Sequence, residues 1–156
     1  MSIKRRIMLK GTLAAGAIGF VAGAGLLSPR AVFAAWSDSA FTATTSPEAL
    51  KSLLGSDSLE DSGKIRIKAP DIAENGAVVP VSVTAELDGV ESITILAEKN
   101  ATPLTASFDL GPGAEPYVST RIKMGKTANV VAVVKAGGKL YSAKKEVKVT
   151  IGGCGG

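Results

Sequence analysis

Apolar and polar residues alternate with a period of two through most of the chain after residue 63, as is typical of half-buried β-strands. Turn-forming residues interrupt this alternation at regular intervals. The pattern predicts seven or eight short strands, at residues 65–68, 78–87, 90–97, 104–110, 117–124, 128–135, 139–142 and 144–151. Many short strands at even spacing predict an all-β fold, an immunoglobulin-like β-sandwich over residues 64–151.

Three local signals refine this expectation. Asp88-Gly89 predicts a hairpin in which residues 90–97 pair back on residues 78–87, and Gly137-Gly138 predicts a second hairpin. Pro80 falls inside an expected strand. Because proline cannot donate a hydrogen bond to a neighbouring strand, it predicts an edge or a bulge there.

A helical pattern occurs once, before the strands. Ser46 is the expected N-cap, Pro47 the first helical residue and Glu48 an acid in the first turn. An apolar stripe follows, and Gly55 ends the helix. Residues 36–45 show little pattern. The sequence therefore predicts a region of lead-in and one short N-terminal helix, residues 35–63.

The first 34 residues have the form of a twin-arginine export signal. Lys4-Arg5-Arg6 begins a charged segment, a weakly apolar run covers residues 11–27, and small residues suit cleavage after Ala34. An uncleaved membrane anchor is the alternative, but glycines and alanines make this run a poor span. We expect export to the periplasm and no membrane attachment after cleavage.

Removal of this segment changes the charge. Five of the 18 basic residues and none of the 14 acidic residues lie before residue 35, so the mature chain has 13 basic and 14 acidic residues, a net charge of −1. The basic excess belongs to the signal and gives no reason to expect nucleic-acid binding. About 122 residues remain, enough for one domain with one core.

The only cysteine, Cys154, is the third residue from the end of the sequence and is flanked by Gly152, Gly153, Gly155 and Gly156. Four glycines favour a flexible arm, residues 152–156, that carries a thiol with no bulky neighbour. The alternative is a merely frayed end. Prenylation is excluded because it needs a cysteine fourth from the end.

The chain contains no histidine, and with a single cysteine it has no Cys-X-X-Cys motif. The commonest general base and metal ligand are therefore absent, and dithiol exchange within the chain is excluded. We expect no catalytic residue, no cofactor-binding residue and no metal site. An exported protein with one unpaired cysteine must pair it with another molecule or keep it reactive.

Three stretches resemble the SoxY family, the sulfur-carrier subunits of bacterial thiosulfate oxidation. They are the ending VKVTIGGCGG (147–156), the run DIAENGAVVP (71–80) and the run VSTRIKM (118–124). The resemblance implies a carrier rather than an enzyme, with Cys154 as the attachment residue for thiosulfate-derived cargo. It implies that the four flanking glycines form the carrier arm.

The resemblance also implies partners. They are a SoxZ-like subunit that forms a heterodimer with this chain, a SoxAX-like haem protein that attaches thiosulfate, a SoxB-like hydrolase that releases sulfate, and a SoxCD-like sulfane dehydrogenase where the pathway includes one.

Two other functions remain open on the residues alone. One is an exported structural β-sandwich that dimerises through a Cys154 disulfide. The other is a ubiquitin-like carrier activated at Gly155-Gly156, which export disfavours because ATP-dependent activation is cytoplasmic. Glu74-Asn75-Gly76 is interpreted as a surface turn with Gly76 at positive φ, or as a docking element for a partner.

Overall fold

The computed structural model describes residues 37–150, which all fall in one of the chain's two compact units. The export signal expected at residues 1–34 and the arm expected at residues 152–156 lie outside the described residues. The described elements are α2 (Asp38–Thr42), α3 (Ser46–Leu54), β1 (Glu60–Asp61), β2 (Ile65–Lys68), β3 (Ile72–Ala73), β4 (Val79–Ala85), β5 (Val90–Ala97), β6 (Leu104–Asp109), β7 (Tyr117–Ile122), β8 (Ala128–Ala136) and β9 (Lys139–Val149).

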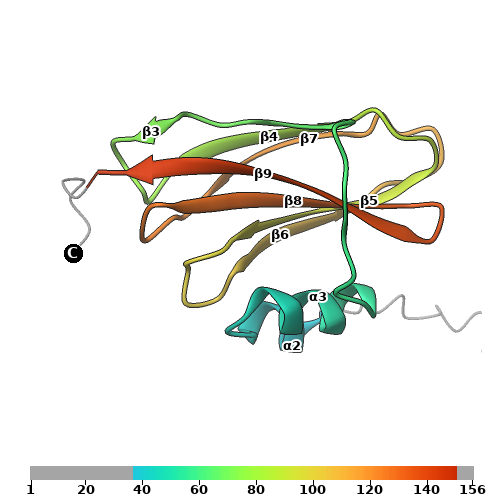
Figure 1. Ribbon diagram of the computed structural model, residues 1–156, viewed down its shortest axis with the longest axis horizontal. Coiled ribbons are helices and arrows are strands. Elements are labelled where there is room, and N and C mark those ends of the chain that lie inside the picture. Colours follow the sequence, from blue (N-terminus) through green and yellow to red (C-terminus); the bar gives the residue numbers. More distant parts are fainter. Residues whose placement is uncertain (1–36, 151–156) are drawn as a thin grey trace, which may run out of the picture. The chain divides into compact units, whose positions relative to one another are not determined.

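The strands form two sheets that pack against each other (Figure 1). The larger sheet has the order β1-β9-β8-β5-β6, with β3 paired to β9, and the smaller has the order β2-β4-β7. Alternate residues of β4, namely Val79, Val81 and Val83, meet Ile93 and Ile95 of β5 in the core between the sheets. The structure confirms the predicted all-β, immunoglobulin-like sandwich.

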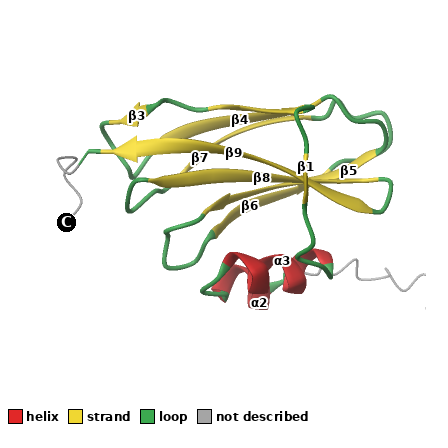
Figure 2. Ribbon diagram, viewed as in Figure 1, coloured by secondary structure: helices red, strands yellow, loops and turns green. Residues whose placement is uncertain are grey.

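Both helices cover the outer face of the larger sheet (Figure 2). Ala40 of α2 and Ala49 and Leu50 of α3 pack in a second apolar cluster with Val131 and Val133 of β8. Strand β8 is therefore buried on both faces, because its alternate residues face the core between the sheets. Residues 36–45 were expected to be irregular, but Asp38–Thr42 is a helix. Burial of Ala40 against the sheet stabilises this short helix, which its sequence pattern does not reveal.

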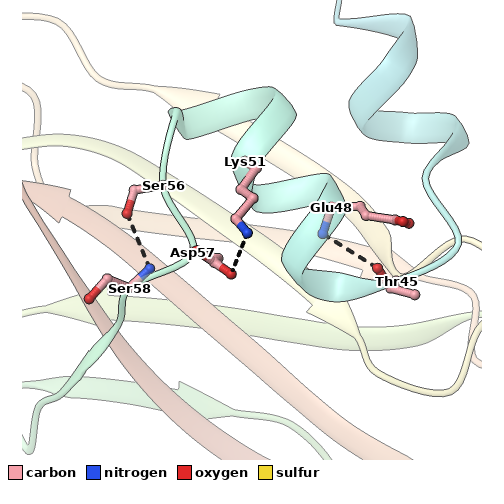
Figure 3. A network of polar contacts seen from close by, with 6 residues as sticks. All are labelled: Thr45, Glu48, Lys51, Ser56, Asp57 and Ser58. Carbon is pink, nitrogen blue, oxygen red and sulfur yellow. Dashed lines mark hydrogen bonds and ion pairs between the residues drawn. The ribbon is translucent and has the colours of Figure 1, made fainter.

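Helix α3 begins one residue earlier than the sequence suggests. Thr45, rather than Ser46, is the N-cap, and its hydroxyl accepts a hydrogen bond from the Glu48 N–H at 3.4 Å (Figure 3). Gly55 ends the helix with φ +78°, as predicted. Beyond it, Asp57 forms an ion pair with Lys51 at 3.2 Å, which ties the following loop back to the helix.

The turn at Asp88-Gly89 corrects one expectation. Strand β4 pairs with β2 and β7, whereas β5 pairs with β6 and β8, so this turn connects the two sheets and is not a hairpin. Strands β4 and β5 contribute apolar residues to the same core from opposite sides. They could not do so if they were paired with each other in one sheet. Gly89 has φ +65°, so its turn geometry still requires glycine.

Strand β9 is longer than predicted. It was expected as two strands, but Ala143 continues the ladder opposite Ala132, which makes Lys139–Val149 one strand of 11 residues. The hairpin at Gly137-Gly138 is confirmed, with both glycines at positive φ. Pro80 lies in the part of β4 that extends beyond β2 and has a partner on one side only, as its chemistry requires.

Candidate functional site: the root of the carrier arm

The sequence placed the candidate site at Cys154 with Gly152, Gly153, Gly155 and Gly156, all outside the described residues. The structure describes the chain up to Thr150, four positions before Cys154. We use the name "arm root" for residues 148–150, which are the end of β9 and the residue after it, together with the two segments that hold them, residues 71–77 and 123–127.

Strand β3 holds one side of the arm root. It runs parallel to β9, with Ile72 opposite Lys148 and Ala73 opposite Val149. The Lys148 N–H donates to the Asp71 carbonyl at 2.9 Å, and the Thr150 N–H donates to the Ala73 carbonyl at 3.2 Å. Figure 1 shows β3 beside the end of β9. The main chain is therefore bonded up to its last described residue.

Thr127 holds the other side. Its hydroxyl accepts a hydrogen bond from the Val149 N–H at 2.9 Å, beyond the last pair of the β8–β9 ladder, Ala128 with Val147. A side chain thus extends the bonding of β9 past the end of β8. With bonds on both sides, the last two residues of the strand have a defined direction.

Gly76 packs directly against the arm root. A Cβ at this position would overlap the Met124 carbonyl oxygen and lie 2.8 Å from Cγ1 of Val149. The Met124 N–H also donates to the Gly76 carbonyl at 2.7 Å. The turn was predicted correctly, since Oδ1 of Asn75 accepts from the Ala77 N–H at 2.9 Å. The expected positive φ of Gly76 is wrong. Close approach of the backbone, not a left-handed conformation, is what excludes a side chain there.

Asn100 is a residue that the sequence reasoning missed. Its side-chain amide donates to the Lys123 carbonyl at 2.7 Å, and its Oδ1 accepts from the Gly125 N–H at 3.0 Å. These bonds fix the β7–β8 loop, which in turn holds Gly76 and Val149. An asparagine before a turn is common, so the only signal in the sequence was its place between two strands.

Two exposed apolar side chains lie on the arm root or next to it. Ile72 is 57% exposed and Val78 is 50% exposed, and both lie on the segment that carries β3 and Gly76. Among residues 37–150 there is no cluster of three acidic, histidine or cysteine side chains suited to a metal ion. In the same range, no helix is long and apolar enough to cross a membrane. The arm root is therefore held in place by hydrogen bonds and has exposed apolar side chains that another protein could contact.

A hollow of about 450 Å³ lies at the opposite end of the sandwich, lined by the β4–β5 turn and the β6–β7 loop. Its one acidic side chain with an ion-pair partner is Glu91, 3.0 Å from Lys135. Hydrogen bonds from Lys135 and then from the Gly138 backbone lower the pKa of Glu91. Glu91 is therefore ionised and paired with Lys135, and Asp88 is the one other charged residue that lines the hollow. The lining offers few of the convergent polar groups that a small-molecule site uses.

The chain is similar to proteins of known structure and to one protein family. Among solved structures, the sulfur carrier protein SoxY from Chlorobium limicola f thiosulfatophilum is 51% identical, with a TM-score of 0.60, and the match covers 66% of this chain and 94% of that one. The human F-spondin reeler domain is 11% identical with a TM-score of 0.42, over 59% and 95% of the two chains. No match was found among curated proteins. The family model described as "Sulfur oxidation protein SoxY" matches residues 50–154, so this chain belongs to the SoxY family.

Proposed function

We propose that this chain is a sulfur carrier that holds thiosulfate-derived intermediates covalently on Cys154 and presents them to partner enzymes. The observation that carries the proposal is the arm root. Hydrogen bonds hold β9 on both sides up to Thr150, and the chain's only cysteine follows four residues later among glycines. The 51% identity to a solved sulfur carrier supports this assignment.

Attachment of the cargo is an oxidation. The Cys154 thiol joins the outer sulfur of thiosulfate, a sulfur–sulfur bond forms, the thiol proton is lost, and two electrons pass to a SoxAX-like haem protein. A SoxB-like hydrolase then adds water to the terminal sulfonate, so that sulfate leaves and a persulfide remains on Cys154. A SoxCD-like sulfane dehydrogenase oxidises that persulfide where it is present. The carrier keeps its cargo bound through all the steps, which raises its effective concentration at each partner.

We also propose that the partner enzymes dock at the arm root. Cys154 is the fourth residue after Thr150, a span of at most about 14 Å. An enzyme that takes the thiol into a buried site must therefore contact the arm root, where Ile72 and Val78 are exposed. We propose that the segment with Glu74-Asn75-Gly76 contributes to this contact or to pairing with a SoxZ-like subunit.

We also propose a periplasmic location, reached by the twin-arginine route. Replacing Arg5 and Arg6 together with lysine should leave uncleaved precursor in the cytoplasm, because paired arginines are what this route recognises. Cell fractionation and immunoblotting measure the result. Normal periplasmic levels of the double variant would contradict this route.

Intact-protein mass spectrometry tests the carrier function against the main alternative, a structural module that dimerises through Cys154. Protein purified from cells that oxidise thiosulfate should carry sulfur-oxyanion or sulfane adducts, each removable by a reductant. A symmetric disulfide with no adduct would favour the structural dimer. An unmodified thiol throughout would favour a frayed end.

A further inference from the structure

Four lysines at the arm-root end of the sandwich have no ion-pair partner among residues 37–150. They are Lys99, Lys123, Lys126 and Lys148, and all are exposed. Two nearby lysines do have partners, since Lys144 lies 3.3 Å from Glu98 and Lys145 lies 3.1 Å from Asp71. The charges of the first four are therefore uncompensated by a neighbouring carboxylate.

The hydrogen bonds of the arm root place all four lysines around it. Each of these lysines lies within two residues of a residue whose hydrogen bonds hold the arm root. In the same order as the lysines, these neighbours are Asn100, Met124, Thr127 and Thr150. The lysines come from three separate parts of the chain, two of them loops, that meet at this end of the sandwich.

Unpaired acidic side chains gather at the opposite end of the sandwich. Asp88 in the β4–β5 turn, Asp109 at the end of β6 and Glu115 in the β6–β7 loop have no ion-pair partner in the described part of the chain. At the arm-root end only Glu74 and Glu146 are unpaired. Arg121, which lies opposite Pro80 in the β4–β7 ladder, also has no ion-pair partner among the described residues, so the four lysines and this arginine outnumber the two carboxylates. The result is a positive excess beside the arm.

We propose that these four lysines create a positive potential at the arm tip that attracts the small sulfur oxyanions this protein carries. This inference rests on the proposed function, because it names the chemical class of the cargo that Cys154 is proposed to carry. Thiosulfate and a bound sulfonate group are anionic at neutral pH. Even a fully extended chain puts Cys154 at most about 14 Å from Thr150, which compares with a screening length of roughly 8–10 Å in physiological salt. The field therefore favours the approach of an anion and the retention of anionic cargo near the body.

The test compares two methanethiosulfonate reagents that differ in charge, one with an anionic sulfonate and one with a cationic trimethylammonium group. With each, the Cys154 thiolate attacks the sulfenyl sulfur, a mixed disulfide forms and methanesulfinate leaves. The ratio of the two rate constants reports the potential at the tip, because the reactivity of the thiol itself cancels. The measurement uses the reduced mature chain and needs no partner enzyme.

Replacing Lys99, Lys123, Lys126 and Lys148 together with glutamine should lower the anionic-to-cationic rate ratio by roughly fivefold or more at about 10 mM salt. The difference should shrink to about twofold near 150 mM salt, where screening is stronger. Glu74→Gln with Glu146→Gln should shift the ratio the opposite way. The matched control replaces four lysines that are not part of the cluster, Lys51, Lys64, Lys135 and Lys139, with glutamine.

A ratio that does not move in the four-lysine variant overturns the inference. An equal shift in the control variant also overturns it, because net charge alone would then explain the effect. Loss of binding to a partner protein with an unchanged rate ratio would assign the lysines to a protein interface instead. If the ratio moves but Cys154 never carries cargo in cells, the proposed function fails while the positive field at the tip stands.

Discussion

Replacing Gly76 with alanine should lower the free energy of unfolding by about 1–3 kcal/mol, seen as a fall in Tm of roughly 4–12 °C. The added Cβ would overlap the Met124 carbonyl oxygen and press on Val149. The first contact is with backbone, so β4, the β7–β8 loop or the end of β9 must shift. Thermal unfolding followed by circular dichroism measures the change.

Gly125 provides a matched control in the β7–β8 loop. A Cβ there would meet nothing closer than Oδ1 of Asn100 at 3.9 Å, and its φ is not positive. Gly125→Ala should therefore leave Tm nearly unchanged. Similar effects of the two substitutions would show that Gly76 is not tightly packed against the arm root.

The Gly76 substitution should also impair cargo transfer at temperatures where the variant is folded. The displaced residue, Val149, is one residue from the last described position of the arm root, so a shift there changes the direction in which the arm leaves. Transfer assays well below the Tm separate this effect from unfolding. Normal transfer in a destabilised variant would limit Gly76 to a role in stability.

Cys154→Ser should abolish thiosulfate-dependent turnover in a reconstituted system and leave Tm unchanged. A hydroxyl cannot form the sulfur–sulfur bond that holds the cargo, and the arm is expected to contribute no packing. A Tm lower by several degrees would show instead that the arm is docked on the body. Turnover that survives the substitution would exclude covalent carriage on Cys154.

Gly153→Val separates the geometry of the arm from the chemistry of its thiol. The β-branched side chain stiffens the chain and widens the tip beside Cys154. We expect a small alkylating reagent to react as fast as with the wild type, while loading by the haem partner slows. Equal slowing of both reactions would indicate a shielded thiol, and unchanged loading would reduce the glycines to a frayed end.

Much of the sandwich could be predicted because each strand carries its own signal. Residues 65–68 and 90–97 alternate or form apolar runs with clear boundaries, and the structure has strands at those positions. The sequence did not reveal which strands belong to the same sheet. Asp88-Gly89 looks the same in the sequence whether it connects paired strands or crosses between sheets, since only the shared core decides. The helix at Asp38–Thr42 was hidden for a similar reason, because tertiary burial of Ala40 stabilises it.

The candidate site, too, could be predicted only in part from the sequence. The interest of Cys154 follows from the sequence, since a lone thiol among glycines is a local pattern. The residues that hold the arm root are scattered over residues 71–127 and contribute through backbone contacts and through the side chains of Asn100 and Thr127. The overlap that excludes a side chain at Gly76 depends on Met124 and Val149, which lie 48 and 73 residues away in the sequence. No local pattern encodes such a contact.

Peptide mass spectrometry tests covalent carriage on Cys154 most directly. Trypsin cleavage after Lys148 releases residues 149–156, a peptide that contains the chain's only cysteine. The mature protein is incubated with thiosulfate and an oxidising SoxAX-type haem protein before digestion without reductant. We expect this peptide to gain one thiosulfate, to lose it on reduction, and to stay unmodified in Cys154→Ser. An unmodified wild-type peptide, or thiosulfate found on any other part of the chain, would contradict the account.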